Sequence, residues 1–196
     1  YLDKQKYINA FVTNGPKIFL TTELLLKTKN IHQVAGVIAH EIGHITGGHL
    51  SKKIKSYEDT MITSIISSIL AVGAIAAGSA DAGTALLLGG QHLSQQNFLS
   101  FSRSQESYAD QAAIKLIENS GYSLRGIYEM FEILEEKERF SKINPYNQSH
   151  PLSGERKKII ELNFNNQEKV KQYPVLDKKF KLIQAKLLGF LSSKDN

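Results

Sequence analysis

The sequence contains no cysteine. Without cysteine the chain can form neither a disulfide nor a thiolate zinc site, so any metal that it holds must be bound by histidine, aspartate or glutamate. The absence also suits an oxidising compartment such as the periplasm. At 196 residues with ordinary aliphatic content, the chain is long enough to bury a core and is not disordered.

Charged side chains are almost absent from residues 60–102, where Asp81 is the only one. Thr60–Ala80 is uncharged and long enough to span a bilayer, but it is rich in serine, threonine, alanine and glycine, so its hydrophobicity is modest. Three interpretations stay open. The segment forms a mobile, glycine-hinged helical pair over the preceding helix, a membrane-surface or re-entrant segment, or a transmembrane helix.

The net charge of +5 comes from the C-terminal part of the chain. Residues 1–149 carry 14 basic and 14 acidic side chains, whereas residues 150–196 carry 10 basic and 5 acidic ones. A basic tail can bind anionic lipid or an acidic partner, or it can be a solvated helical face. No arginine-rich run or nucleic-acid motif occurs, so we expect no binding to nucleic acid.

The hydrophobic pattern predicts an α+β fold that is mainly α. Residues 8–20 read as two short strands around the turn signal Asn14-Gly15, and Pro16 favours an edge position for the second strand. Asn30 is the expected N-cap of the next helix. Further helices are predicted over residues 103–119, 124–140, 151–162 and 175–191. The apolar face of the helix after Asn30 is predicted to hold Val34, Val37, Ile38, Ile42 and Ile45, and that of the 124–140 helix Ile127, Met130, Phe131 and Leu134.

The most informative motif is His40-Glu41-Ile42-Gly43-His44, which has the H-E-x-x-H spacing of zinc peptidases. Residues i and i+4 lie on one face of a helix about 5–6 Å apart, so two imidazoles there can reach one Zn²⁺. Glu41 lies beside the first ligand, where it can act as general base. We therefore predict that His40 and His44 bind zinc.

A third protein ligand is required, and the best candidate is Glu106. Glu106 and Asp110 are also i and i+4 on a predicted helix. Glu106 is expected to bind the metal, and Asp110 to hold a ligand imidazole in one tautomer. Ala109 is small enough to let this helix approach the histidine helix closely.

Together with Asn9-Ala10-Phe11, Asn14-Gly15, His150-Pro151 and Arg156, these residues resemble the gluzincin metallopeptidase family that includes HtpX, the Oma-type mitochondrial protease and the CAAX prenyl protease. The bacterial periplasmic BepA-like branch is the most similar. The resemblance implies a gluzincin-like core with a small β-sheet or hairpin packed on the H-E-x-x-H helix. It also implies one Zn²⁺ per chain, bound by His40, His44 and Glu106.

The resemblance further implies that Asn9-Ala10-Phe11 belongs to the edge strand that pairs with an extended substrate. His150 and Arg156 match catalytic positions of the family. His150 is expected either to stabilise the oxyanion with help from Arg156, or to occupy the fourth zinc position and keep the enzyme latent. A helix-capping histidine is the structural alternative.

The expected function is zinc-dependent endopeptidase activity on unfolded, misfolded or envelope proteins, that is, protein quality control. The alternative is a chaperone-like envelope assembly factor with a latent peptidase site. Expected partners are polypeptide substrates, with possible contact to the membrane or to outer-membrane assembly machinery. We predict a metallopeptidase domain over residues 1–165 and a C-terminal helical extension over residues 166–196, which is the possible start of a helical repeat domain.

Overall fold

The computed structural model describes residues 2–13, 16–140, 150–151, 154–165, 167 and 169–192. Its contacts divide the chain into two compact units, one comprising Tyr1–Gly47 with Glu106–Asn196 and the other Gly48–Gln105. Each unit is described by itself below. The predicted boundary near residue 165 stays a prediction, since these units divide the chain at other positions.

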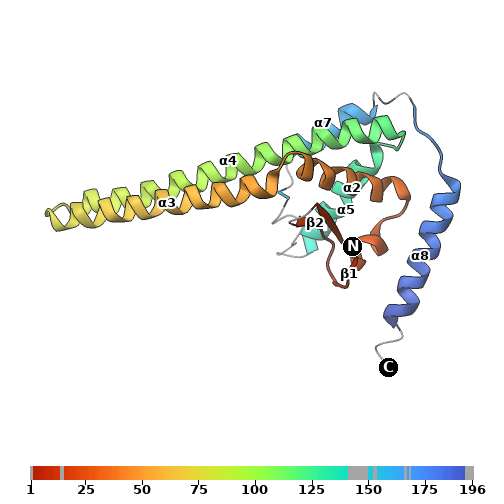
Figure 1. Ribbon diagram of the computed structural model, residues 1–196, viewed down its shortest axis with the longest axis horizontal. Helices are drawn as coiled ribbons and strands as arrows, with labels where there is room; N and C mark the ends of the chain where they lie inside the picture. Colours follow the sequence, from red (N-terminus) through yellow and green to blue (C-terminus); the bar gives the residue numbers. More distant parts are fainter. Residues whose placement is uncertain are drawn as a thin grey trace. The chain divides into compact units, whose positions relative to one another are not determined.

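The first unit begins with a small sheet of three strands, β1 (Leu2–Asp3), β2 (Ala10–Thr13) and β3 (Lys17–Thr21). The strand order is β1-β3-β2, with β1 parallel and β2 antiparallel to β3. Strands β1 and β2 are labelled in Figure 1. The prediction that the second hairpin strand lies at an edge is therefore wrong, because β3 is central. Pro16 precedes the first residue of β3, so its missing N–H removes no ladder bond.

Side-chain N-caps begin both α1 and α2, and the cap predicted at Asn30 is confirmed. Thr21 Oγ1 accepts a hydrogen bond from the Leu24 N–H at the start of α1 (Thr22–Lys27). Asn30 Oδ1 accepts one from the Gln33 N–H, 3.0 Å away, at the start of α2 (Ile31–Thr46). Gln33 Oε1 in turn accepts from the Lys29 N–H at 2.7 Å, a variant of the capping box. These bonds fix where the H-E-x-x-H helix begins.

The buried face of α2 differs from the predicted one. Ile38, Ile42 and Ile45 are only half-buried, and the face that packs deepest passes through small and polar residues. A Cβ at Gly36 would lie 2.9 Å from Ile127 of α5, so the missing side chain lets these helices come close. Val34 and Val37 of the predicted face are confirmed as buried. The buried residues of the helix are Gln33, Val34, Gly36, Val37, Ala39, His40, Glu41, Gly43 and His44.

The core of this unit forms where α5 (Arg125–Phe140) packs against α2 and against α7 (Gly154–Asn165). The four residues predicted to face inward on α5 are all at most 2% exposed, which confirms that prediction. β2 and β3 contact α2, so the small sheet packs on the H-E-x-x-H helix as expected.

The predicted helix over residues 103–119 is the last part of a longer helix, α4 (Ala80–Ser120). This helix ends before Gly121, which has the left-handed conformation (φ +79°).

The C-terminal helix α8 (Pro174–Ser192) packs against α1 and α2. Its side chains satisfy backbone groups at two helix ends. Asp177 Oδ1 accepts from the Ile31 N–H at 3.2 Å, and Gln184 Nε2 donates to the carbonyls of Leu25 and Thr28 at 2.7 and 2.8 Å. The helix is thus tied to the start of the metal-binding helix.

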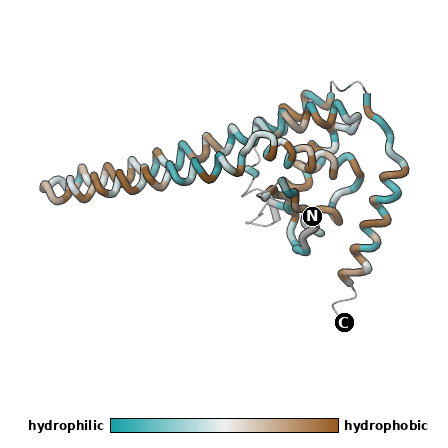
Figure 2. The backbone as a smooth tube through the Cα atoms, in the orientation of Figure 1, coloured by the Kyte–Doolittle hydropathy of each residue, from teal (hydrophilic) through white to brown (hydrophobic). Residues whose placement is uncertain are grey.

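The second unit consists of α3 (His49–Ala76) and the first part of α4, joined by a turn at Ala77–Ser79. Residues 60–102 therefore form a helical pair. Among the described residues, α3 is long and apolar enough to cross a membrane, by length and composition alone. Figure 2 shows the apolar residues along both helices of the pair. The expectation that the pair covers the metal-binding helix stays a prediction.

Candidate metal centre

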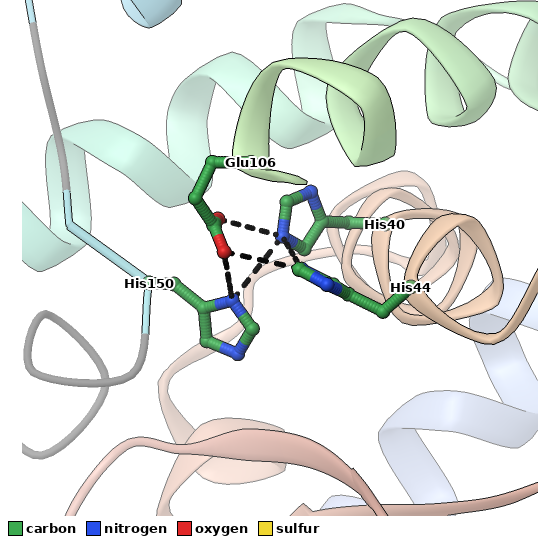
Figure 3. A group of neighbouring side chains, drawn as sticks. All are labelled: His40, His44, Glu106 and His150. Atoms are coloured by element: carbon green, nitrogen blue, oxygen red, sulfur yellow. Dashed lines mark hydrogen bonds and ion pairs between the residues drawn. The ribbon is translucent and has the colours of Figure 1, made fainter. Parts of the chain in front are cut away.

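Helix α2 presents two buried imidazoles on one face. His40 is 1% and His44 6% exposed, and their Nε2 atoms lie 3.0 Å apart (Figure 3). Both side chains lie on the buried face of α2. The i, i+4 spacing alone accounts for the convergence of the two rings.

Helix α4 comes to these histidines through a backbone contact. A Cβ at Gly43 would lie 2.7 Å from the carbonyl oxygen of Ala109 and 2.8 Å from its Cα. The expected close approach at Ala109 is present, and Gly43 is its required counterpart. Sequence reasoning gave Gly43 no role, although its position inside the motif could have indicated one.

Two further donors complete the cluster. Glu106 Oε2 lies 3.3 Å from His40 Nε2, and Glu106 Oε1 lies 3.3 Å from His44 Nε2. His150 Nδ1 lies 3.2 Å from Glu106 Oε1 and 3.4 Å from His40 Nε2 (Figure 3). All four residues are buried, and one donor atom from each lies within 4.8 Å of every other.

These separations fit a tetrahedral metal site. Ligand atoms placed tetrahedrally around Zn²⁺ at about 2.0–2.1 Å are about 3.3–3.4 Å from one another. The measured distances of 3.0–3.4 Å between the donors are close to this edge length. The donor set is imidazole and carboxylate, as the absence of cysteine requires. The residues present therefore fit a bound metal ion.

A second layer of contacts holds the ligands. His40 Nδ1 lies 2.9 Å from Asp110 Oδ1, so the ring is oriented with Nε2 toward the cluster. Arg156 contacts both Asp110 oxygens, at 2.6 Å from Nε and 2.9 Å from Nη2. Its Nη1 lies 3.0 Å from Glu106 Oε2 and donates to the Pro151 carbonyl at 2.7 Å. These contacts favour a positioning role for Arg156 over the oxyanion role predicted from the resemblance.

Glu41 lies within the same buried region, and its carboxylate is not hydrogen-bonded within the part of the chain that the structure describes. It is 0% exposed, and neither oxygen has a hydrogen-bond partner among the described residues. His150 Nε2 lies 3.5 Å from Glu41 Oε1. Burial raises the pKa of Glu41 above its usual value. A buried carboxylate of this kind needs a donor such as a water molecule bound beside it.

With its imidazoles neutral, as metal binding requires, the site has an excess of negative charge. Three buried carboxylates, of Glu41, Glu106 and Asp110, accompany a single buried guanidinium, that of Arg156. Burial would raise the pKa of Asp110, but hydrogen bonds from Arg156 lower it below the usual range, so Asp110 is ionised. Uncompensated charge in a buried site is unfavourable, and a divalent cation would neutralise the excess.

The imidazoles respond to this environment in opposite ways. Burial lowers the pKa of His44 to about 4, despite the hydrogen bond to Glu106, and so keeps its ring neutral. Burial acts in the same direction on His40, but Asp110 and Glu106 outweigh it and raise the pKa to about 9. Burial likewise opposes ionisation of Glu106, but its histidine partners lower the pKa of this carboxyl well below its usual range. A metal ion and a proton compete for the same imidazole lone pair, so a bound ion would replace the proton at Nε2 of His40.

The predicted substrate-binding residues lie on β2 and just before it. The Thr21 N–H donates to the Asn9 carbonyl at 3.0 Å, and the Asn9 N–H donates to Thr21 Oγ1 at 2.9 Å. The register pairs Phe11 with Phe19, whose rings stack 5.2 Å apart. Of the predicted site residues, the structure brings together His40, Glu41, His44, Glu106, Asp110, His150 and Arg156, whereas Asn9, Ala10 and Phe11 belong to the neighbouring sheet.

Comparison with known proteins gives several relatives. A beta-barrel assembly-enhancing protease of Escherichia coli (strain K12) is 32% identical over 155 residues, which cover 78% of this chain and 31% of the relative. A protein of the same name from Yersinia pestis is 27% identical over 201 residues, covering 100% of this chain and 40% of the relative. The chain thus spans about a third of the length of these relatives.

The family model for Peptidase family M48 matches residues 1–162. This range contains all four residues of the donor cluster together with Glu41, Asp110 and Arg156. The match agrees with the resemblance seen in the sequence, and because it covers most of the chain, the chain belongs to Peptidase family M48.

Proposed function

We propose that this chain is a zinc-dependent endopeptidase domain. The observation that supports it most directly is the convergence of His40, His44 and Glu106 at tetrahedral spacing, beside the buried and uncommitted carboxylate of Glu41. Two imidazoles and a carboxylate are a frequent protein ligand set of catalytic zinc. Imidazole and carboxylate donors at this spacing suit zinc better than calcium or magnesium, which prefer six or more oxygen ligands.

The residues of the chain then have distinct tasks. When bound, the zinc ion would polarise the scissile carbonyl and lower the pKa of a water molecule to about 7. Glu41 accepts the proton of that water and passes it to the leaving amine, and its burial-raised pKa makes it a better base. Asp110 and Arg156 keep His40 and Glu106 in place, so that the ligands need no rearrangement during the reaction.

The substrate is proposed to bind along β2, the edge strand of the described sheet. The Thr21 N–H bond to the Asn9 carbonyl and the β2–β3 register direct the backbone groups of Asn9, Phe11 and Thr13 toward β3. The N–H and C=O groups of Ala10 and Val12 therefore point away from β3 and can pair with an extended peptide. Recognition through the backbone suits unfolded or misfolded polypeptides of varied sequence.

The test measures zinc content and peptide hydrolysis in parallel. We expect about one zinc ion per wild-type chain, loss of that zinc in Glu106→Ala, and retention of zinc with loss of hydrolysis in Glu41→Gln. Glu41→Gln is the informative variant, because it keeps the size of the side chain and removes its basicity. Undiminished turnover by Glu41→Gln would remove Glu41 from the mechanism, and a folded wild type that refuses added Zn²⁺ would refute the enzyme proposal.

The relatives suggest the cellular setting. They are named beta-barrel assembly-enhancing proteases, so we propose that this chain acts on envelope proteins in a bacterial periplasm and meets outer-membrane assembly machinery. The absence of cysteine agrees with that compartment. Because the relatives are about three times longer, we assign their substrates and partners to this chain only as part of this proposal.

A second function is favoured by the position of His150. Its Nδ1 lies among the zinc donors, where the substrate or the reactive water would bind, and its Nε2 faces Glu41. In this arrangement His150 keeps the peptidase latent, and the protein acts mainly as a chaperone-like assembly factor. Equal rescue of an envelope defect by wild type and by Glu41→Gln would support this function.

The variant His150→Ala separates the two roles of His150. We expect zinc to stay bound, because His40, His44 and Glu106 remain. A latency role predicts faster hydrolysis in the variant, whereas an oxyanion role predicts that kcat falls by about 10²–10³-fold. Loss of zinc would instead make His150 a structural ligand of the site.

A further inference from the structure

The helical pair of residues 60–102 carries its large apolar side chains on the outside. On α3, Ile69 is 65% and Val72 66% exposed, and on α4 Leu88 is 62% exposed. Between these residues there is no charged side chain except Asp81, which lies just after the turn. The other large apolar residues exposed in this segment are Met61, Ile62, Ile65, Ile66, Leu70, Ile75, Leu86, Leu93 and Leu99.

The contact between the two helices is made mainly by small residues. A Cβ at Gly83 would lie 2.4 Å from Cγ1 of Ile75, whose side chain packs over this glycine, and 2.8 Å from the carbonyl oxygen of Ala71. One at Gly90 would lie 2.1 Å from Ser67 Oγ. Ala71 is 0% and Ser94 5% exposed. The two helices therefore approach closely at glycine, alanine and serine, with Gly83 and Gly90 seven positions apart on α4.

This distribution is the reverse of the one expected for a helical hairpin in water. In water, isoleucine and leucine drive association and lie between the helices, with polar residues outside. In a bilayer the lipid is as apolar as leucine, so helices associate through small residues and turn their large apolar side chains to the lipid. The residues between and outside these two helices follow the second pattern.

Six hydroxyl groups of the apolar stretch bond within their own helix and need no water, whereas the buried Ser94 Oγ has no hydrogen-bond partner among the described residues. Thr63 Oγ1 donates to the Asp59 carbonyl at 2.9 Å, Ser68 Oγ to the Ser64 carbonyl at 2.8 Å, and Thr84 Oγ1 to the Ala80 carbonyl at 3.0 Å. Thr60, Ser64 and Ser67 make the same bond one helical turn back. Hydroxyls satisfied within their own helix can be placed in hydrocarbon.

We propose that residues 60–102 insert into a lipid bilayer as a helical hairpin, with the turn at residues 77–79 leading. Residues 60–76 extend over about 25 Å of helix, which is more than one leaflet of a hydrocarbon core about 30 Å thick. The exposed side chains of Lys52, Lys53 and Lys55 precede the apolar part of α3, where they can meet anionic head groups. The partner is thus a lipid surface, and the hairpin is its anchor. This inference does not depend on peptidase activity.

The experiment uses the absence of tryptophan from the chain, because a single introduced tryptophan then reports its own surroundings. Ile69→Trp places the probe on the outer face of α3, and Val175→Trp places it at a site of equal exposure, 66%, on α8. The full-length variants are mixed with vesicles of phosphatidylcholine and phosphatidylglycerol that carry bromine at defined acyl-chain depths. Helix content and zinc content establish that each variant is folded.

Insertion predicts a blue shift and strong quenching of the tryptophan at position 69 by acyl-chain bromine, with neither at position 175. It also predicts that Ile69→Asp reduces co-flotation with vesicles at least tenfold, while Val175→Asp floats like wild type. The proposal is overturned if position 69 is not quenched, or if both positions are quenched alike, since that indicates adsorption of the whole chain. A third outcome also overturns it: wild type sediments as a dimer and does not bind vesicles, and the substitution Ile69→Asp dissociates the dimer. The apolar face would then bind a second copy of the chain.

Discussion

Substitution of Gly43 by alanine tests whether the backbone contact between α2 and α4 sets the geometry of the metal centre. The added Cβ would lie 2.7 Å from the Ala109 carbonyl oxygen, where ordinary contact begins at 3.4 Å. The added Cβ is fixed to the backbone of α2, and the Ala109 atoms that it meets belong to the backbone of α4. Neither can turn away, so the helices must separate by about 0.7 Å. His40 and His44 would move away from Glu106 by a similar distance, whereas metal–ligand distances vary by only about 0.2 Å.

We therefore expect Gly43→Ala to weaken zinc binding by about 10–100-fold and to lower the free energy of unfolding by about 1–3 kcal/mol. Zinc affinity is measured by competition with a chromophoric chelator, and stability by urea unfolding of the metal-free chain. The second measurement removes the contribution of the metal to folding.

The matched control is Gly36→Ala on the same helix. Its Cβ would lie 2.9 Å from the Ile127 backbone nitrogen, so it strains the α2–α5 contact to a similar degree without separating the metal ligands. We expect a comparable loss of stability and a near-normal zinc affinity. If Gly43→Ala binds zinc as tightly as wild type, or if both variants lose zinc equally, the contact with Ala109 does not set the ligand geometry.

Two other variants address the surroundings of the site. Arg156→Lys removes the two-point contact with Asp110, so we expect unfolding to become easier by about 3–5 kcal/mol in a denaturant titration and zinc affinity to fall about 10–100-fold; unchanged values in both would show that the arginine is dispensable. Val12→Pro removes an outward-facing N–H of β2 without touching the β2–β3 ladder, so kcat/KM for an unstructured peptide should fall about tenfold, mainly through KM, while zinc and folding are kept. Val12→Ala is its control, and equal kcat/KM in the two variants would exclude β2 as the substrate strand.

The relative positions of the proposed metal ligands within each helix could be predicted because their geometry is local. His40 with His44, and Glu106 with Asp110, are each one helical turn apart, so the sequence spacing determines their relative positions. The caps at Thr21 and Asn30 were predictable for the same reason, since each bond reaches only three residues along the chain.

Features that depend on distant parts of the chain were harder to predict. The central position of β3 depends on β1, whose two residues, Leu2 and Asp3, are too few to form a pattern. His150 and Arg156 were found only through the family resemblance, and nothing in the sequence showed that the guanidinium turns to Asp110. The requirement for Gly43 likewise arises from a neighbour 66 positions away along the chain.

The attachment of α8 bears on the order in which the protein folds. The bond from the Ile31 N–H to Asp177 joins residues 146 positions apart, so the start of the histidine helix is completed only when the end of this chain is available. Contacts of such long range close slowly, because much chain entropy is lost before they form. During synthesis the bond at the start of the histidine helix would therefore form only after α8 has been made. A chain cut short before Pro174 lacks this partner for the Ile31 N–H, so the start of the histidine helix should fray even with every metal ligand present.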